Sequence, residues 1–371
     1  MTVASAGKPG KEWLRISNFS WLHTPAWSGS TVGRMFRLLR LAGRAIIFAL
    51  KGAGWMAAQV RAAKGLKRRI QVVYRFLPFA GRRWDVVYFP WNSAAITFLP
   101  LFDLAKAGVV SCRGSQVNIA PHNPRRVAIR EGLRLTFERS TAVHCVSEAM
   151  KVEVQGWGLD PKKAQVIYAG ADPEFFCPGA SVERSKDLFR VVMTGTLSWV
   201  KGYEYALSAF RGLLDQGINA RLRIIGEGPE RQRVLYTIYD LGLEDHVQLL
   251  GRLTPDAVRN ELHQADAFLL ASVSEGISNA ALEAMACGLP VVTTDCGGMQ
   301  EAVRDGIEGF VVSVRDVAAM TGALARLASN SEKCVQMGKA GRKRVLSTFT
   351  LRRHVDQFTA LLEGISGSLV G

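Results

Sequence analysis

The sequence predicts an α/β protein of two domains, each built on a parallel sheet. Segments with the pattern of buried strands alternate along the chain with segments of helical periodicity, which is typical of parallel sheets. A hydrophobic content of 48% and 36 glycines fit many tight turns between strands and helices. The length of 371 residues is sufficient for two hydrophobic cores of ordinary domain size.

In the N-terminal half, three apolar runs are predicted to be buried strands, and they span 84–90, 109–112 and 142–146. A charged segment from Arg125 to Arg139 predicts an exposed helix. Ser147 is a suitable N-cap for a helix that begins at Glu148. Residues 166–172 are expected to be the last part of this domain.

Composition and periodicity suggest five consecutive parts. A basic, helical N-terminal region over 1–84 belongs to the first domain, whose remainder spans 85–172. A linker of polar and small residues follows over 173–187. The second sheet domain occupies 188–349, and the last segment, 350–371, is predicted to be helical.

Positive charge is concentrated at the N-terminus. Residues 1–84 hold 16 Lys and Arg against the single acid Glu12, and the other residues hold 31 of each sign. From Val32 to Ile70, basic residues interleave with apolar ones, which predicts one or two basic amphipathic helices. Such helices suit an anionic membrane surface, where each basic residue contributes about 1 kcal/mol. The alternatives are a packing helix with a solvated basic face and, third, nucleic acid, for which no motif is found.

The six cysteines are scattered without a Cys-x-x-Cys pair. This pattern indicates neither a zinc site nor a disulfide framework and favours a reducing cytosol. No run of ~18 or more uncharged apolar residues occurs, so no transmembrane helix is expected. The N-terminus does not read as a cleavable signal peptide. We therefore expect a cytoplasmic protein that is peripheral on the cytoplasmic face of the membrane.

The segment from Ser274 to Val292 carries the candidate chemistry. Two carboxylates, Glu275 and Glu283, lie eight positions apart where a loop enters a short apolar helix. Burial of an unpaired carboxylate is costly, so Glu283 requires hydrogen-bond donors, which the hydroxyls of a ligand could supply. The alternative is structural, with Glu275 as a solvated loop charge and Glu283 as a cap for neighbouring backbone.

The start of this helix is suited to bind phosphate. Ser278 or Asn279 can act as the N-cap, and the unpaired amides and partial positive charge behind it attract anions. Gly276 and Ile277 precede the cap, and the glycine lets backbone approach a ligand closely. Helical side chains lean toward the N-terminus, so Glu283 points back to the same spot.

This segment resembles the nucleotide-sugar site of retaining glycosyltransferases with the GT-B fold, the large family 4 group (glycosyl transferases group 1), which has a Glu-x7-Glu signature. Four further segments match motifs of this family in the expected order, and they span 192–202, 224–230, 247–252 and 297–301. The resemblance implies two Rossmann-like domains that face each other across a cleft. It also implies a C-terminal helix that crosses back onto the first domain.

The resemblance further implies a hexosyl-type transfer (EC 2.4) from a nucleotide-diphosphate sugar to a glycan or lipid-linked acceptor, without a metal or other cofactor. It places Glu283 on the ribose hydroxyls, and Lys201 with residues 276–279 at the diphosphate. Glu275 then lies on the sugar side, where it orients hydroxyls and steadies the cationic transition state. Electrostatic stabilisation of the leaving group supplies much of the rate enhancement. No metal-ligand spacing occurs in the sequence.

The donor motif departs from the family at one position. Gly195 and Lys201 match, but a small or apolar residue stands where the family usually has an Arg. Loss of a bidentate Arg weakens the grip on the diphosphate by about 1.5–3 kcal/mol. Arg113 or Arg252 could compensate. The alternative for Lys201 is a solvated lysine at a helix start.

Arg113 is itself a second departure. Many members of the family have a histidine at this place, near the reacting sugar, whereas some polysaccharide and lipopolysaccharide enzymes have an Arg. Arginine stays protonated and cannot act as a general base, but it can hold a phosphate or sugar hydroxyl as a fixed cation. A structural Arg that ties two loops together is the alternative. His122 lies in a Pro-His-Asn-Pro loop and is interpreted as structural.

Two further motifs are weaker. The pair Gly226 and Gly228 lacks the third glycine of a dinucleotide site and is interpreted as a tight turn. Glu301, after a Gly-Gly pair, is interpreted as a first-turn acid that favours its helix dipole.

The family's first strand and glycine-rich loop are not found, and residues 27–30 are a weak candidate for that loop. Either the N-terminal domain is abbreviated or the chain begins late relative to its relatives.

Three functions remain in competition. The basic N-terminus and Arg113 favour an active glycosyltransferase in lipopolysaccharide or exopolysaccharide assembly. The missing loop and missing Arg support a non-catalytic GT-B protein that binds a nucleotide sugar or acts as a scaffold. A sugar-nucleotide epimerase would need acid/base residues around the sugar, and no good set is found. We favour the first.

Overall fold

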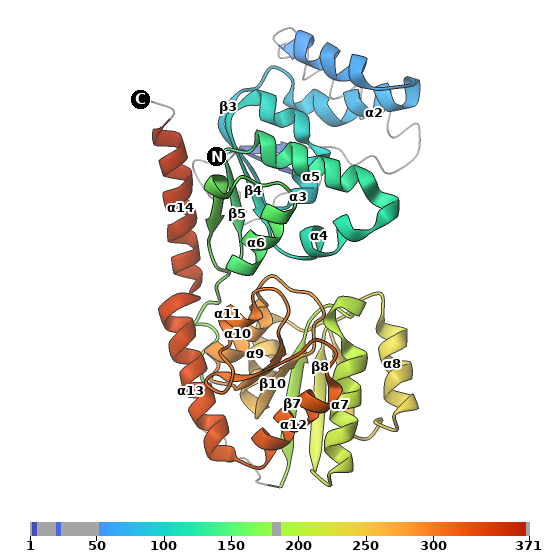
Figure 1. Cartoon of the computed structure of the whole chain (residues 1–371), viewed down its shortest axis with the longest axis vertical. Helices are drawn as coiled ribbons and strands as arrows, with labels where there is room; N and C mark the ends of the chain where they lie inside the picture. Colours follow the sequence, from blue (N-terminus) through green and yellow to red (C-terminus); the bar gives the residue numbers. More distant parts are fainter. Residues whose placement is uncertain (1, 6–19, 24–51, 180–186, 369–371) are drawn as a thin grey trace. The chain divides into compact units, whose positions relative to one another are not determined.

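The computed structural model describes most of the chain, with gaps near the N-terminus, in the linker and at the last three residues (Figure 1). The described ranges are 2–5, 20–23, 52–179 and 187–368. The predicted basic helices between Val32 and Lys51 and the weak candidate loop over 27–30 lie outside these residues.

The chain divides into two compact units. The first comprises Met1–Val87 and Pro100–Ala107, and the second comprises Tyr88–Leu99 and Gly108–Gly371. Contacts reported below for the candidate site join residues of the second unit only.

The first unit begins with two short strands that pair in parallel, β1 (Thr2–Ser5) and β2 (Ser20–His23). Residues 52–62 form a helix, and α2 (Leu66–Phe76) follows after a break at Gly65. The rings of Trp55 and Phe76 meet edge to face at 6.0 Å between centroids, so the apolar sides of the two helices pack together.

A four-stranded sheet follows, with the order β3-β4-β5-β6. The three strands β4, β5 and β6 pair in parallel. The strands are β3 (Trp84–Phe89), β4 (Ala105–Cys112), β5 (Ala142–Cys145) and β6 (Ala164–Val166). The helices between them are α3 (Asn92–Thr97), α4 (Ser115–Asn118), α5 (Val127–Arg139) and α6 (Glu148–Gly156).

A six-stranded parallel sheet forms the C-terminal half, with the order β12-β11-β10-β7-β8-β9. The chain therefore moves outward from the central β7 in one direction and returns to start again at β10 on its other side. The strands are β7 (Phe189–Thr194), β8 (Ala220–Ile225), β9 (Val247–Gly251), β10 (Ala267–Leu270), β11 (Val291–Thr294) and β12 (Gly309–Val312).

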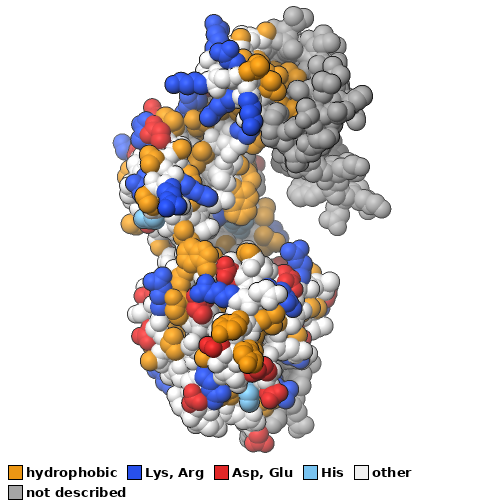
Figure 2. Space-filling model, turned by 90° about the vertical axis from the view of Figure 1, so that its right-hand side faces the viewer, with side chains coloured by type: hydrophobic (Ala, Val, Ile, Leu, Met, Phe, Trp, Pro, Cys, Tyr) orange, Lys and Arg blue, Asp and Glu red, His pale blue; other side chains and the backbone are white. Residues whose placement is uncertain are grey.

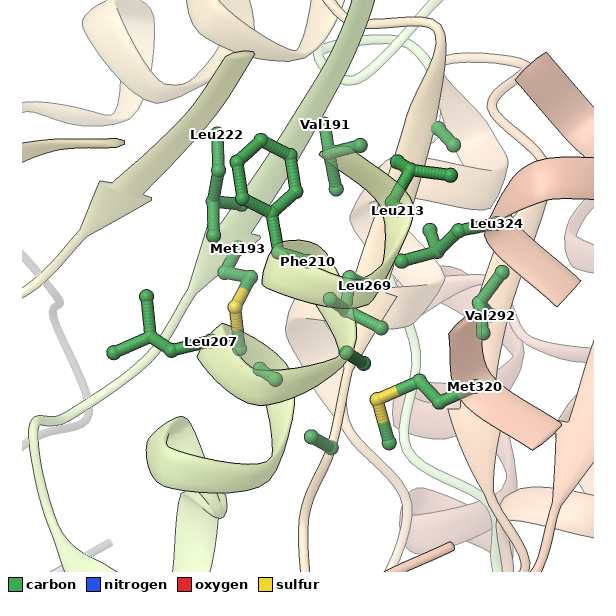
Figure 3. Close-up of a cluster of buried hydrophobic side chains, with 14 of the residues drawn as sticks. Val191, Met193, Leu207, Phe210, Leu213, Leu222, Leu269, Val292, Met320 and Leu324 are labelled. Carbon is green, nitrogen blue, oxygen red and sulfur yellow. The ribbon is translucent and has the colours of Figure 1, made fainter. Parts of the chain in front are cut away.

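Helices cover both faces of this sheet (Figure 1). One core joins the sheet to α7 (Tyr203–Asp215), α8 (Arg231–Asp240) and α12 (Val317–Ala328), and Figure 3 shows Phe210 of α7 among side chains from β7, β8 and α12. The other core joins it to α9 (Pro255–Gln264), α10 (Asn279–Ala286), α11 (Met299–Ala302) and α13 (Ser331–Thr348). Strands covered on both faces explain the continuous apolar runs of the sequence.

The last helix, α14 (Leu351–Gly367), is capped by Thr350, whose side chain accepts a hydrogen bond from the amide of Arg353. Its Phe358 contacts Tyr88 of β3 and His144 of β5 at 5.5 and 4.5 Å between ring centroids. The C-terminal helix therefore packs against strands of the four-stranded sheet.

The predicted fold class, α/β with two parallel sheets, is confirmed. The predicted helix over 125–139 differs in two respects. It begins at Val127 after a 3-10 turn at Pro124–Arg126, and it buries Leu133 and Phe137 rather than lying fully exposed. No helix among the described residues is long and apolar enough to cross a membrane.

Candidate active site

The candidate site lies where the chain reverses its direction across the large sheet. Lys201 follows β7 and Glu275 follows β10, and these neighbouring strands send their helices to opposite faces. Loops after such strands diverge and leave a crevice at the carboxyl end of the sheet, which is the usual ligand position in open α/β folds. The topology therefore brings together two residues that are 74 positions apart in sequence.

Glu275 is held by protein groups on one side only. Lys201 donates a short hydrogen bond from Nζ to Oε1 of Glu275, and the Ser272 hydroxyl donates to the same oxygen at 2.8 Å. The Glu275 side chain is 13% exposed and that of Lys201 22%. No partner from the described residues reaches the second carboxylate oxygen, Oε2. This oxygen is therefore available to a ligand. The positive charge of Lys201 is already balanced by the negative charge of Glu275.

Glu283 has the environment that its sequence context predicted. It lies on the second turn of α10 between buried apolar neighbours. Burial raises the pKa of its carboxyl to about 7. No side-chain hydrogen bond or ion pair reaches this carboxylate from the residues that the structure describes. The prediction that Glu283 caps neighbouring backbone thus finds no support, and the group lacks the donors that a buried carboxylate requires.

The N-terminus of α10 faces the same place. Ser278 is the N-cap, and its hydroxyl accepts a hydrogen bond from the amide of Ala281 at 3.4 Å. In the described part of the chain, the amides of Ile277 and Asn279 have no hydrogen-bond acceptor. These free donors and the helix dipole make the end of α10 suitable for an anion.

Glycines let this loop pass very close to the ends of β4 and β5. A Cβ atom on Gly276 would lie 2.5 Å from the carbonyl oxygen of Arg113 and 2.5 Å from Cγ2 of Val146. The amide of Gly298 donates to the carbonyl of Gly276 at 2.7 Å, and a Cβ on Gly298 would lie 2.4 Å from Cβ of Ser147. Side chains at these two glycines would force the loops apart.

Gly195 is also packed closely against its neighbours. Tyr203 donates a hydrogen bond from its hydroxyl to the carbonyl of Gly195 at 3.0 Å. A Cβ on Gly226 would lie 1.9 Å from the same carbonyl, and Gly226 has a φ of 143°, which only glycine adopts readily. The predicted tight turn at Gly226 thus supports the loop that carries Lys201.

Arg113 directly follows β4, and its backbone carbonyl lies close to Gly276 of the loop after β10. Its Nη2 donates to the Tyr88 hydroxyl at 3.3 Å, and its guanidinium lies 5.6 Å from the ring centroid of Trp91. Its Nε is buried and has no acceptor among the described residues. Since buried donors are almost always paired, this nitrogen is a candidate ligand contact.

Arg252, the other residue predicted to compensate for the missing Arg, is exposed directly after β9. The carbonyl of Gly251 accepts a hydrogen bond from the amide of Gly226 at 2.8 Å, so the end of β9 lies beside the turn at Gly226. In the described ranges no hydrogen bond or ion pair joins Arg252 to Lys201 or Glu275. Arg252 is therefore not part of the hydrogen-bonded group formed by Lys201 and Glu275.

A cavity of about 450 Å³ lies next to Glu275. Asn118 donates from Nδ2 to the carbonyl of Glu275 at 3.1 Å and to Ser274 at 3.4 Å. The cavity thus combines an aromatic ring with charged groups and an amide, a combination that is typical of small-molecule sites. The residues lining it include Asn118, Glu153, Trp199, Ser274, Gly297 and Arg315.

Glu301 has a role that sequence reasoning missed. Its two carboxylate oxygens accept hydrogen bonds from the amides of Glu148 and Ala149 at 2.9 and 2.8 Å. It therefore caps α6, and it also lies in the first turn of its own helix α11, as predicted. The Ser-Glu pattern at Ser147 marked the start of α6, but nothing local in the sequence indicated a cap that comes from 153 positions away.

No group of three or more His, Cys, Asp or Glu residues that could hold a metal ion is found over the described ranges. None of the six cysteines, which all lie in the described ranges, forms a disulfide bond.

Two family profiles match the chain, and each covers one half. The profile described as Glycosyltransferase Family 4 matches residues 21–175, and the profile described as Glycosyl transferases group 1 matches residues 180–344.

Related sequences agree with this result. The chain is 30% identical over 236 residues to WcaL of Escherichia coli K12, named as a glycosyltransferase of colanic acid biosynthesis, and to the amylovoran biosynthesis glycosyltransferase AmsK of Erwinia amylovora. Each alignment covers 62% of this chain and 58% of the relative, so the chain matches little more than half the length of these proteins.

Among solved structures, HepE of Anabaena in complex with UDP-glucose has a TM-score of 0.66 and 20% sequence identity, with 76% of this chain and 79% of HepE covered. This level of similarity shows the shared fold. The chain belongs to the family 4 glycosyltransferases with the GT-B fold, as its motifs predicted. The predicted enzyme class, EC 2.4, is the class of this family.

The raised pKa of Glu283 generates a prediction about stability. A carboxyl with a higher pKa in the folded than in the unfolded state binds its proton more tightly when folded, so the free energy of unfolding falls as pH rises from about 4.5 to about 7. The Glu283→Gln variant should match the wild type at pH 5 and exceed it at pH 8, by up to about 3 kcal/mol. Thermal unfolding of both proteins without nucleotide, at both pH values, measures this. If the difference in stability between the variant and the wild type is the same at pH 5 and at pH 8, the Glu283 carboxyl is solvated and this prediction is wrong.

Proposed function

We propose that the chain transfers a sugar from a nucleotide-diphosphate sugar to a glycan or lipid-linked acceptor, with retention at the anomeric carbon. The observation that carries this proposal is the half-buried, unpartnered carboxylate of Glu283 on the helix whose free N-terminus lies beside the Lys201–Glu275 pair. A nucleotide diphosphate has the groups that this arrangement lacks, namely ribose hydroxyls as donors and phosphate oxygens as acceptors.

In this proposal each group has a separate task. Glu283 accepts hydrogen bonds from the ribose hydroxyls, and the amides of Ile277 and Asn279 bind the diphosphate. Lys201 bridges the diphosphate and Glu275. Oε2 of Glu275 and Nε of Arg113 remain for the sugar and its leaving oxygen, since neither has a partner among the described protein groups.

The reaction breaks the bond between the anomeric carbon and the leaving diphosphate oxygen. The acceptor hydroxyl oxygen forms the new bond on the same face, and its proton passes to the departing diphosphate. Negative charge grows on the diphosphate in the transition state, so the amides and Lys201 lower the barrier by binding it more tightly then. Glu275 stabilises the cationic sugar.

The acceptor is proposed to occupy the cavity beside Glu275. Trp199 is 48% exposed there and offers a ring face to a sugar, while Glu153 and Arg315 offer hydrogen bonds to hydroxyls. WcaL and AmsK are named for polysaccharide biosynthesis, which supports a role in cell-surface polysaccharide or lipopolysaccharide assembly. HepE was solved with UDP-glucose, which supports a nucleotide sugar as donor.

A cytoplasmic, membrane-peripheral location is part of the proposal. Six cysteines without a disulfide bond fit a reducing compartment. On α2, Leu66 and Ile70 are 75% and 43% exposed, and the neighbouring Lys67, Arg68 and Arg69 are exposed as well. In Figure 2, Lys and Arg side chains stand largely without acids on the helices at the top, whereas both signs are interspersed below.

The two carboxylates should separate binding from transfer. Glu275→Gln should keep the donor affinity within about threefold, because Glu283, Lys201 and the helix amides remain, and should lower kcat by about 100-fold or more. Glu283→Gln should instead raise the donor dissociation constant. Calorimetry with the nucleotide sugar and an assay of nucleotide release measure both, with Glu174→Gln as the exposed control. Equal loss of donor affinity in both variants would refute this division.

Exchange of Lys67, Arg68 and Arg69 for Gln should weaken binding to vesicles that contain phosphatidylserine by about 10-fold or more at low salt, since each basic residue contributes about 1 kcal/mol. Cosedimentation measures the bound fraction. The matched control replaces three exposed basic residues elsewhere, Lys339, Lys343 and Arg352. If both triple variants bind as the wild type does, the membrane contact is not on α2.

A further inference from the structure

A continuous row of hydrogen-bonded side chains crosses the four-stranded sheet and ends at Arg113. Nη2 of Arg113 lies 3.3 Å from the Tyr88 hydroxyl, which lies 2.8 Å from the Ser111 hydroxyl. The Ser111 hydroxyl lies 2.7 Å from Nδ1 of His144, and Nε2 of His144 lies 2.8 Å from the carbonyl oxygen of Ile167. The three central residues come from β3, β4 and β5, which are adjacent in the sheet, and Ser111 is directly opposite His144 in the register.

Chemistry fixes the direction of every bond in this row. The Ile167 carbonyl can only accept, so Nε2 of His144 carries a proton. With a neutral ring, Nδ1 is an acceptor and must receive the Ser111 proton. Ser111 then has no proton left for Tyr88, so the Tyr88 hydroxyl donates to Ser111 and presents its lone pairs to Arg113. The result is one chain of donors that runs from the guanidinium to Ile167.

Burial keeps the His144 ring neutral. Ser111 and His144 are fully buried, and desolvation lowers the pKa of His144 to about 3. The charged or titratable groups that face it are Arg113 and His354, and both disfavour a second proton. Phe358 of α14 covers the row by contact with the His144 and Tyr88 rings. Within physiological pH the direction of the bonds therefore does not change.

Arg113 gains a defined orientation from this row. A long side chain with several rotamers loses entropy when it is fixed on a substrate, and a bond to a rigid, buried acceptor reduces that loss. The row determines where Nη2 points, and Nε of Arg113 is buried without an acceptor among the described residues. The carbonyl of Arg113 is meanwhile in close contact with Gly276, in the loop between β10 and α10.

We propose that Tyr88, Ser111 and His144 are positioning residues that aim the guanidinium of Arg113 at the sugar and leaving oxygen of the donor. The contact of Arg113 with substrate rests on the function proposed above. The row itself touches no substrate, so its members act on the reaction through Arg113 alone. Its loss should lower kcat with little change in donor affinity, because Glu283 and Lys201 lie outside it.

A double-mutant cycle tests this dependence. Tyr88→Phe keeps the ring against Phe358 but removes the acceptor of Arg113, and should lower kcat about 10-fold while KM for the donor stays within about twofold. Arg113→Gln should cost more, and the double variant should be no slower than Arg113→Gln. Tyr236→Phe, at an exposed tyrosine, is the matched control. Multiplied losses in the double variant would show that Tyr88 acts independently of Arg113 and would overturn the proposal.

A second measurement needs neither activity nor a variant of the row. Proton–nitrogen NMR correlation of the histidine rings should show His144 as the neutral form with its proton on Nε2 from pH 5 to pH 8. A proton on Nδ1, or a charged ring at pH 7, would reverse the row and overturn the proposal. Failure of the proposed function is distinguishable, since the wild type would then release nucleotide from no sugar donor while the NMR result still decides the direction of the row.

Discussion

The candidate site depends on one close approach of backbone to backbone, between the loop after β10 and the ends of β4 and β5. Gly276 and Gly298 have no Cβ, so the loops reach within van der Waals contact of Arg113 and Ser147. That approach brings the backbone of Arg113 to the loop that joins Glu275, the partner of Lys201, to the free end of α10. It also explains why Glu301 can cap α6, because Gly298, three residues before Glu301, lies against Ser147, the N-cap of α6.

The electrostatics of the crevice follow from this geometry. Glu275 and Lys201 are mostly buried and neutralise each other, whereas Glu283 is half-buried and has no partner among the described residues. A buried pair is tolerated when hydrogen bonds complete it, and Ser272 supplies one. Burial without a partner instead raises the pKa of the Glu283 carboxyl, which therefore holds a proton more readily. Hydrogen bonds donated by the hydroxyls of a ligand would lower this pKa and restore the negative charge of Glu283. The site is therefore organised for a polar ligand before one binds.

The sequence was sufficient for the fold class, for the N-cap at Ser278 and for the position of Glu283 on the second turn of the helix that Ser278 caps, because these depend on local spacing. The resemblance implied that Lys201 and Glu275 belong to one site. It did not imply their direct contact, which depends on the strand order. The cap by Glu301 and the row at His144 join residues from distant segments, and no periodicity indicates them. The exposure of α5 was overestimated because its buried Leu133 and Phe137 are outnumbered by charges.

The most direct test is a comparison of nucleotide affinity with and without ribose hydroxyls. Calorimetric titration with UDP, GDP and ADP, and with the 2′,3′-dideoxy forms, measures it for the wild type and for Glu283→Ala. The account predicts that one ribonucleotide binds the wild type at least about 10-fold more tightly than its dideoxy form, the scale of a hydrogen bond to a charged group. It also predicts that this preference disappears in Glu283→Ala. A preference that persists in the variant, or a folded wild type that binds none of these nucleotides, would contradict the account.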